Sequence, residues 1–309
     1  MLLLDFINVG YGDAILLRET NSGYTLLVDC GDKDVGKGPP GSKRLTAAEF
    51  LRRENVERID LVVLTHLHKD HAGGLLALSR QVAIGQLWSN YLPPSEAAPP
   101  THQFEGEQAI KNLTRALEDF CAALEFLRAR GTKLVEIKSA QPEIKLTSSL
   151  LLNVSCAPEP LIKLQADILD AFFTPPFETK GLFELDSFIN DTSLRLTVEY
   201  EGRIIYLPGD TSASSKAQAE PKRCDILKLS HHGHKDAITQ AQLNALLPEY
   251  VVVSVSSTRK DNCPNKALME QIANQVPNVL FTGSAHIQGR APAYHHSVRL
   301  CIDEGRIFE

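Results

Sequence analysis

Short apolar runs, separated by residues that favour turns, predict a meander of strands at the start of the chain. We expect strands over residues 2–9, 14–18 and 24–28, with the turn sequences Gly-Tyr-Gly-Asp and Asn-Ser-Gly between them. Apolar residues at helical spacing predict a helix over residues 46–55. The continuous apolar run of residues 59–64 then predicts a strand that is buried on both faces.

The middle of the chain has a different pattern, with longer amphipathic stretches. Residues 107–130 and 161–172 carry apolar side chains at helical spacing, and residues 148–155 read as a strand. We interpret the stretch from about residue 85 to 185 as an insertion. Two roles are open for its helices: they lie near the mouth of a site, where insertions set substrate choice, or they serve packing alone.

The second half returns to short apolar runs. Strands and helices alternate there, with strands predicted over residues 194–199, 204–207, 226–229, 250–255 and 279–281 and helices over 239–247 and 266–276. Strand clusters with intervening helices in both halves fit two sheets packed face to face with helices outside. The pattern alone supports an α/β or α+β fold.

Candidate metal ligands follow the buried run of residues 59–64. Four of them stand within six residues: His66, His68, Asp70 and His71. Imidazole and carboxylate at this density suit zinc, manganese or iron. A histidine-rich polar loop is the alternative, but residues 207–211 and 229–233 deliver Asp210, His231 and His232 at the ends of two further apolar runs. Three strand ends that carry His and Asp predict a metal centre at the edge of a sheet.

Length and charge narrow the possibilities. The chain has 309 residues, long enough for one large domain or two ordinary ones, and the motifs between residue 5 and beyond residue 230 share one site. We therefore expect a single domain over residues 1–309. Its 32 basic and 38 acidic residues give a net charge of −6, which disfavours a broad polyanion-binding surface but permits a basic groove beside a metal centre.

Localisation signals point to the cytoplasm. No apolar run approaches the roughly 18–20 residues of a membrane span. The start of the chain, Met-Leu-Leu-Leu-Asp, lacks the basic residues and the long apolar core of a signal peptide. The six cysteines are scattered without a C-x-x-C pair, so we expect buried free thiols.

The HxHxDH motif from His66 to His71 resembles that of the metallo-β-lactamase superfamily. Further segments resemble the competence-protein (ComEC-like, DNA-internalisation) branch, in the order of that branch: residues 5–17, 28–31, 190–194, Gly209-Asp210 and 228–233. The likeness covers almost the whole chain and is weaker over residues 85–185. It implies a four-layer αββα sandwich with inserted helices, here in a free-standing soluble form.

The resemblance also implies a ligand set for two metal ions. It assigns His66 and His68 to the first ion, Asp70 and His71 to the second, and Asp210 to both as a bridge. A histidine from the pair His231-His232 completes the second site. His231 is favoured because it lies nearer the strand end, and His232 then serves as an acid or as a donor to a ligand.

The first metal site departs from the superfamily pattern. Many members supply a histidine from the loop before the hairpin that leads to the bridging aspartate, but between His71 and Asp210 this chain has only His102, far upstream. Asn190 and Asp191 stand in that place. We infer that Asp191 replaces the histidine, and oxygen ligands would shift the preference toward manganese. The alternative is that both residues only form a turn.

The chemistry that the resemblance implies is hydrolysis by a hydroxide that two divalent ions, zinc or manganese, share, with Asp70 or a neighbouring histidine moving the proton. A phosphodiesterase or nuclease acting on nucleic acid or a nucleotide is the leading prediction. A hydrolase of a small molecule, such as a nucleotide signal, lactone or thioester, is the second. A metal-stabilised interaction subunit is the third, and it would need neither Asp70 nor Asp210.

Overall fold

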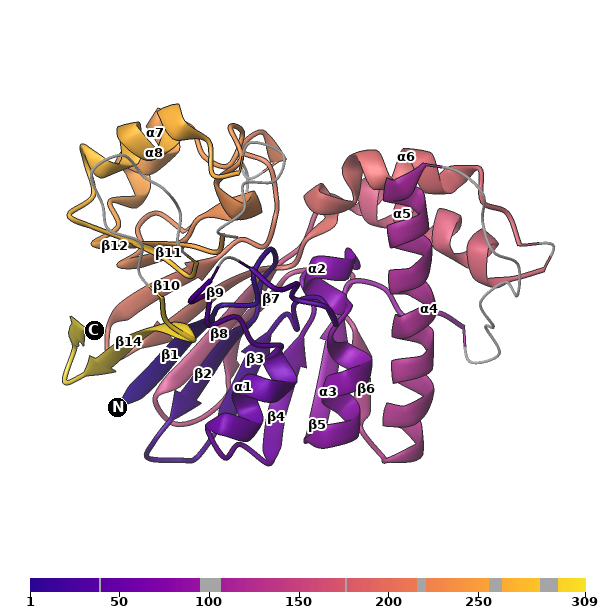
Figure 1. Ribbon diagram of the computed structural model, residues 1–309, viewed down its shortest axis with the longest axis horizontal. Coiled ribbons are helices and arrows are strands. Elements are labelled where there is room, and N and C mark those ends of the chain that lie inside the picture. The colour runs from indigo at the N-terminus through magenta and orange to yellow at the C-terminus, as the bar shows by residue number, and fades with distance from the viewer. Residues whose placement is uncertain (39, 95–106, 176, 216–220, 256–262, 284–293) are drawn as a thin grey trace.

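A computed structural model describes residues 1–38, 40–94, 107–175, 177–215, 221–255, 263–283 and 294–309 (Figure 1). His102 lies outside these residues. Among the helices that the structure describes, none has the length and hydropathy needed to cross a membrane. All six cysteines are free and five of them are buried, as the sequence predicts.

The first sheet contains eight strands in the order β15-β14-β1-β2-β3-β4-β5-β6. Their bounds are β1 Leu2–Ile7, β2 Ile15–Glu19, β3 Thr25–Val28, β4 Arg58–Val63, β5 Ala83–Ser89, β6 Lys133–Glu136, β14 Ser297–Asp303 and β15 Arg306–Phe308. The first three strands form the predicted antiparallel meander, and β3 to β6 run parallel. The carboxyl ends of β3 and β4 therefore meet at one edge of the sheet.

The second sheet contains seven strands in the order β13-β12-β11-β10-β9-β8-β7. Their bounds are β7 Gln141–Lys145, β8 Leu150–Ser155, β9 Arg195–Tyr200, β10 Arg203–Leu207, β11 Ile226–Lys228, β12 Tyr250–Val253 and β13 Asn278–Phe281. The predicted hairpin is β9 and β10, and β10 to β13 run parallel. The carboxyl ends of β10, β11 and β12 again lie together.

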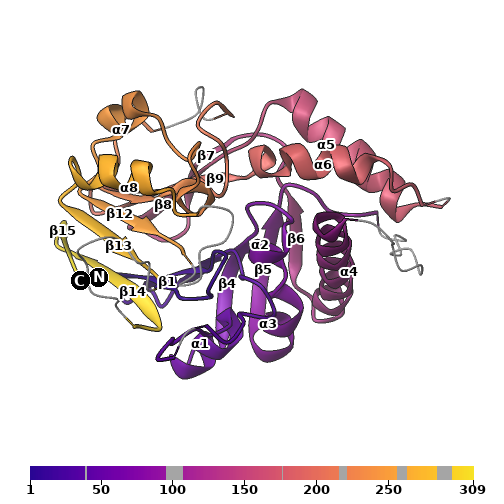
Figure 2. The same ribbon diagram turned by 45° about the horizontal axis from the view of Figure 1, so that its top comes forward.

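Helices cover the outer face of each sheet (Figures 1 and 2). On the first sheet these are α1 Ala47–Arg53, α3 Leu75–Gln81 and α4 Gln108–Ala129; on the second they are α7 Gln240–Leu246 and α8 Lys266–Ala273. One apolar core lies between the sheets and includes Leu4, Leu61 and Leu196. A second core joins the first sheet to its helices, and a third joins the second sheet to α7 and α8. Helix, sheet, sheet and helix thus form four layers, which confirms the predicted fold class.

The stretch from about residue 85 to 185, interpreted as an insertion, supplies strands β6 to β8 of the two sheets as well as helices, and two of its helices form one group at the end of the molecule above α4 (Figure 1). They are α5 Glu159–Phe173 and α6 Gly181–Phe188, and α6 runs directly into the short 3-10 helix η1 Ile189–Thr192. Helices α5 and α6 pack against each other, and α6 also contacts α4. The sequence predicts α4 and α5, but α6 is not predicted, because it is only eight residues long and follows a proline-rich turn.

Candidate metal centre

The loop after β4 is held by Asp29, which follows β3. Asp29 adopts a left-handed backbone with φ 59°. Its Oδ1 accepts the backbone N–H of Thr65 at 2.7 Å, and its Oδ2 accepts the Thr65 hydroxyl at 2.7 Å. Two buried hydrogen bonds to a carboxylate fix the start of the histidine loop relative to the neighbouring strand. The short helix α2 Lys69–Ala72 then carries Asp70 and His71.

Gly12 permits a close approach to this loop. Its φ is +134°, and a Cβ on it would lie 2.2 Å from the carbonyl oxygen of Asp70. The following residue, Asp13, donates its backbone N–H to that same carbonyl at 3.1 Å. The Gly-Tyr-Gly-Asp turn therefore packs directly on the backbone of a predicted ligand, and no side chain fits at residue 12.

His66 and His68 face each other through one ring nitrogen each. Nε2 of His66 lies 3.2 Å from Nδ1 of His68. Two nitrogen ligands about 2.0–2.1 Å from a tetrahedral metal ion lie roughly 3.3 Å from one another, so this pair has the spacing of two ligands of one ion. The other ring nitrogen of His66 lies 3.1 Å from Oγ1 of Thr65 and 3.3 Å from Oγ of Ser193.

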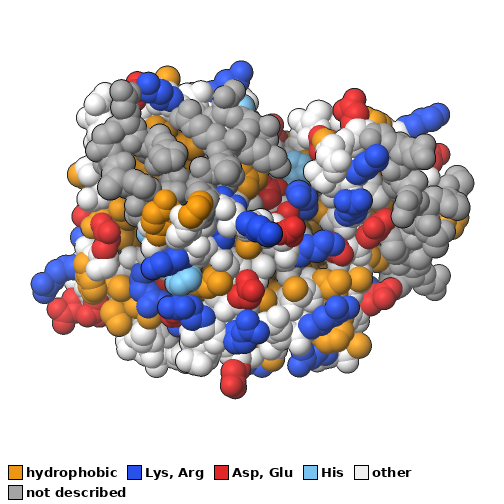
Figure 3. All heavy atoms as spheres, in the orientation of Figure 1, with side chains coloured by type: hydrophobic (Ala, Val, Ile, Leu, Met, Phe, Trp, Pro, Cys, Tyr) orange, Lys and Arg blue, Asp and Glu red, His pale blue; other side chains and the backbone are white. Residues whose placement is uncertain are grey.

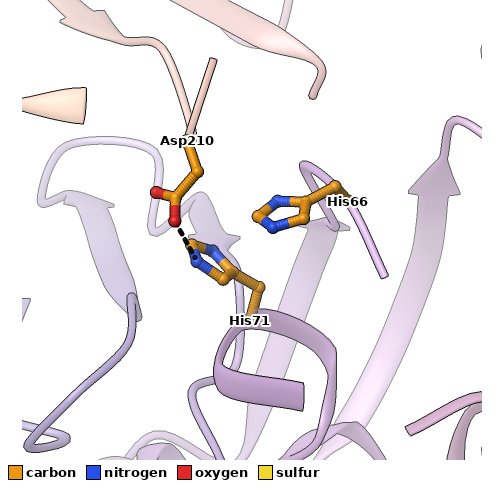
Figure 4. A group of neighbouring side chains, drawn as sticks. All are labelled: His66, His71 and Asp210. Carbon is orange, nitrogen blue, oxygen red and sulfur yellow. Dashed lines mark hydrogen bonds and ion pairs between the residues drawn. The ribbon is translucent and has the colours of Figure 1, made fainter. Parts of the chain in front are cut away.

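A second group of ligands surrounds Oδ2 of Asp210. Nε2 of His71 lies 3.1 Å from this oxygen, and Nε2 of His232 lies 3.2 Å from it. Nε2 of His232 is also 3.3 Å from Oδ2 of Asp70. Figure 4 shows His66, His71 and Asp210 converging from three different segments. These spacings again match the distances between ligands of one ion.

His232 carries a buried nitrogen that requires a partner. Its ring is fully buried, yet within the described part of the chain Nε2 makes no well-aligned hydrogen bond, although two carboxylates lie within 3.3 Å. A buried polar atom in this state is costly unless something binds it. A divalent cation between the imidazole and the carboxylates would satisfy all of them, so the donor set fits the metal that the HxHxDH motif predicts.

The outward nitrogens of His71 and His232 have partners that fix each ring. Nδ1 of His71 lies 2.8 Å from Oδ2 of Asp29, and Nδ1 of His232 lies 3.1 Å from the carbonyl oxygen of Ser254. Each Nδ1 therefore carries the proton and leaves Nε2 for the centre. Partners of this kind orient metal-binding histidines and fix their tautomer.

His231 lies outside this buried group, whereas His232 lies inside it. Consecutive left-handed residues, His231 with φ 47° and His232 with φ 52°, turn the chain sharply and send the two rings in different directions. The ring of His231 is half-buried; its Nε2 accepts a hydrogen bond from Nδ2 of Asn190 at 3.4 Å, and its Nδ1 lies 3.7 Å from Asp236. The geometry thus gives His232 the position that sequence reasoning gave to His231.

Asn190 and Asp191 also differ in what they contact. Oδ1 of Asp191 accepts the backbone N–H of Ser212 at 2.8 Å, and Asp191 belongs to none of the His, Cys, Asp and Glu groups that could hold an ion among the described residues. Asn190 lines the same cleft as His68 and Asp210. Its Oδ1 is buried and has no hydrogen-bond partner within the described chain. Of the two residues, Asn190 therefore carries the buried oxygen without a partner in the described chain.

Lys228 is a site residue that the sequence pattern does not predict. Its buried Nζ forms an ion pair with Asp13 and lies 3.3 Å from Oδ1 of Asp210. Burial alone would lower the pKa of Lys228, but the charges of Asp13 and Asp210 raise it above its ordinary value. A lysine that ends the apolar strand β11 was the available signal, because a buried lysine needs a carboxylate partner.

The electrostatics of the buried group favour bound positive charge. Burial would lower the pKa of His71, but Asp210 and Asp29 raise it well above its usual value. Burial likewise opposes the protonated form of His232, yet Asp210 raises the pKa of this ring to about 9. Against the upward effect of burial, the two imidazoles hold the pKa values of Asp70 and Asp210 below their usual range. Ionised carboxylates and imidazoles at this density are candidate ligands for a cation.

A cleft of about 460 Å³ opens onto these residues. Figure 3 shows histidine side chains at the bottom of a hollow, with acidic side chains beside them. One wall is formed by α4 and α6, which contribute Leu113 and Asp186, and another by Tyr11, Val35 and Arg44. The volume lies within the usual range for small-ligand sites. Helices α4 and α6 therefore border the site, and a role of these helices in substrate choice stays a prediction.

Comparison with known proteins agrees with the motif and the geometry. Residues 7–115 match the family model described as the metallo-beta-lactamase superfamily. These findings support membership of the metallo-β-lactamase superfamily. Members bind divalent metal ions, and the buried His and Asp groups supply the candidate ligands.

Individual superfamily relatives are distant. ComE operon protein 3 of Bacillus subtilis (strain 168) is 22% identical over 293 residues, which cover 90% of this chain and 31% of that protein. The chain thus spans about a third of the length of ComE operon protein 3. Among solved structures, YhfI of Bacillus subtilis is 11% identical with a TM-score of 0.47 and covers 91% of this chain and 96% of its own. Igni18 of Ignicoccus hospitalis is 16% identical with a TM-score of 0.47, and the match covers 98% of this chain and 100% of that chain. The short form of human tRNase Z is 13% identical with a TM-score of 0.44, and the match covers 91% of this chain and 96% of that chain.

Proposed function

We propose that this protein is a metal-dependent phosphodiesterase that acts on nucleic acid or on a nucleotide. The observation that carries the proposal is the shared carboxylate: Asp210 lies within ligand distance of His71 and His232 and in one potential metal-binding group with His66. Two ligand sets that meet at one carboxylate are the arrangement of a two-metal hydrolytic centre. The site lies at the bottom of a cleft rather than in a closed core.

The first ion would be held by His66 Nε2, His68 Nδ1 and Asp210. We assign the remaining position to Oδ1 of Asn190 instead of Asp191, since this oxygen is buried, lacks a partner within the described chain and lies on the same cleft. An amide oxygen preserves the oxygen-rich character that sequence reasoning attributed to this site. Oxygen ligands suit manganese better than an all-imidazole site does.

The second ion would be held by Asp70, His71, His232 and Asp210. When bound, a pair of divalent ions acidifies water and neutralises the charge that develops on phosphoryl oxygens. Lys228 stabilises the negative charge of the shared carboxylate, because its Nζ lies beside the Asp210 oxygen that faces away from His71. Asp29 keeps the proton of His71 on Nδ1 and so keeps Nε2 available.

His231 is the side chain best placed to move a proton in the cleft. Its Nε2 accepts from the amide of Asn190, while its Nδ1 points toward Asp236. Burial lowers the pKa of His231, so the ring is neutral at pH 7, and the electron pair on its Nε2 faces the Asn190 amide. We therefore assign the proton transfer to His231: its Nε2 exchanges the weak hydrogen bond from Asn190 for the proton that the attacking water releases, and it then gives that proton to the leaving group.

The nature of the substrate rests on two supports. The segments that resemble the competence-protein branch favour a nucleic acid, and ComE operon protein 3 is similar over 90% of this chain. An oxygen-rich first site favours a hard phosphoryl substrate. Because the net charge is −6, we expect modest affinity for a polyanion that falls steeply with salt.

A small-molecule ester is the second candidate, and the lining of the cleft favours it. Apart from the ligands, the cleft presents three carboxylates, Asp32, Asp34 and Asp186, against the two cations Arg44 and Lys69. Lys69 is itself paired with Asp32 at 2.9 Å. Such a lining offers little attraction to the flanking phosphates of a long strand.

Parallel assays with wild type and Asp210→Ala separate these candidates. Labelled single-stranded DNA, duplex DNA, RNA, cyclic nucleotides and a small carboxylic ester would be incubated with manganese or zinc. The proposal expects manganese-stimulated phosphodiester cleavage by wild type that Asp210→Ala loses. Equal background cleavage by both proteins, together with ester hydrolysis by wild type alone, would favour the second candidate.

A further inference from the structure

The geometry points to Asp186, on the inserted helix α6, as the residue that positions His68 for metal binding. Oδ1 of Asp186 lies 3.5 Å from Nε2 of His68. This is the ring nitrogen that faces away from His66, since Nδ1 of His68 lies 3.2 Å from His66 Nε2. The inference rests on the metal centre proposed above and adds an outer partner that comes from the insertion.

The tautomer of His68 requires such a partner. A histidine that binds a metal through Nδ1 must carry its proton on Nε2, whereas a free imidazole exchanges between both forms. His68 is only partly buried, with a side-chain exposure of 22%, so packing alone does not fix its ring. The carboxylate of Asp186 favours the proton on Nε2 and thereby leaves Nδ1 for the ion.

The other three histidines of the centre have partners within the two-sheet framework. His66 contacts Thr65 and Ser193, His71 contacts Asp29, and His232 contacts the carbonyl oxygen of Ser254. These four partners follow β3, β4 and β12 or precede β9. His68 thus differs from the other three in having its outer partner on α6.

The path of the chain connects Asp186 to a second site residue. Asp186 and Asn190 stand four residues apart, and between them α6 ends at Phe188, whose φ of −130° departs from the helical backbone. Both residues line the cleft, so this short segment brings two side chains to the site. Leu182 and Leu185, both buried, hold α6 in place. The segment of α6 and η1 therefore contributes two side chains to the centre in addition to a wall of the cleft.

The pair of Asp186 and His68 contributes little to folding stability. The side chains of Asp186 and His68 are 32% and 22% exposed, and ion pairs at such positions contribute little to folding stability. Loss of Asp186 should consequently leave the fold intact and change metal binding. This difference separates a positioning residue from a merely structural one.

Metal affinity provides the first test. Zinc and manganese binding to the full-length, chelator-stripped protein would be measured by competition with a chromogenic chelator. Asp186→Ala should lower the affinity for one of the two ions by about 10- to 100-fold and leave the affinity for the other unchanged. Asp186→Glu should recover part of the loss. Glu184→Gln, on the same helix, is the matched control and should bind both ions as wild type does. Wild-type affinity for both ions in Asp186→Ala would overturn the inference.

The tautomer of His68 provides a second test, which does not depend on bound metal. Long-range ¹H–¹⁵N spectra of the metal-free protein, assigned with His68→Gln, should show His68 protonated on Nε2 in wild type and as a mixture of tautomers in Asp186→Ala. An unchanged tautomer would overturn the inference. If wild type bound no metal while the tautomer shifted as expected, the proposed function would fail and the role of Asp186 would stand.

Discussion

Lys228 lies behind Asp210, with its Nζ 3.3 Å from Oδ1, while Oδ2 of the same carboxylate faces His71 and His232. The backbone N–H of His231 also donates to Oδ1 at 3.2 Å. One oxygen of Asp210 is thus held by the protein and the other is directed to the ligands. This division fixes the orientation of the shared carboxylate before any ion binds.

Replacing Lys228 should therefore affect folding as well as activity. Lys228→Met removes the buried partner of Asp13 and leaves that carboxylate uncompensated, which typically costs about 3–5 kcal/mol. Urea unfolding of the metal-free protein measures this loss. Lys235→Met, at an exposed lysine, is the control. A Lys228→Met protein as stable as the control would show that the buried pair is unimportant.

Two neighbouring histidines should have separate effects. His232→Ala should remove the second ion, because the ring reaches both Asp70 and Asp210. His231→Ala should keep both ions but lower kcat and abolish the acidic limb of the pH–rate profile, because His231 moves the proton. Metal content by elemental analysis and a kcat profile decide the matter. Loss of metal in His231→Ala with retention in His232→Ala would reverse the assignment.

Asn190 and Asp191 can be distinguished in the same way. Asn190→Ala should weaken binding of the first ion. Asp191→Ala should retain both ions and lose about 1.5–3 kcal/mol of stability, the range for a hydrogen bond to a charged group such as that from Ser212. Isothermal titration with manganese and thermal unfolding would be measured for both variants. Full metal binding by Asn190→Ala beside failure of Asp191→Ala would restore the original prediction.

The metal-free protein should lose stability as the solution becomes alkaline. Although burial opposes its charge, His232 has a folded-state pKa of about 9 because Asp210 and Asp70 hold its proton, above the ordinary value of 6.5. Stability from this group is complete below pH 6.5 and is lost as the pH rises through 9. Thermal unfolding in chelator between pH 6 and 10 would show the decline. His232→Gln should flatten it, and an identical slope in both proteins would contradict the pKa shift.

The sequence was informative where residue type and strand position coincide. The structure brings together the five candidate ligands that follow strongly apolar strands, because the parallel strand ends of each sheet meet at one edge: His66, His68, Asp70, His71 and Asp210. The order of His231 and His232 could not be inferred, because two successive left-handed residues reverse the expected direction of their rings. Such a backbone depends on the surrounding structure and leaves no periodic signal.

Contacts that come from the insertion were also beyond the sequence. Asp186 lies on a short helix that was not predicted, and its meeting with His68 joins residues 118 positions apart along the chain. Asn190 and Asp191 are adjacent, similar in size and both polar, so only the direction of each side chain distinguishes them. In the sequence Lys228 is a polar residue at a strand end, and only the folded structure shows its ion pair with Asp13.

The most direct test of the whole account is the number of metal ions that the chain binds. Protein purified without chelator, then loaded with manganese or zinc and freed of excess ion, would be measured by elemental analysis beside Asp210→Ala. We expect two ions per chain in wild type and clearly fewer in Asp210→Ala, because that substitution removes the carboxylate common to both ligand sets. A content near zero in wild type, unchanged after loading, would contradict the account.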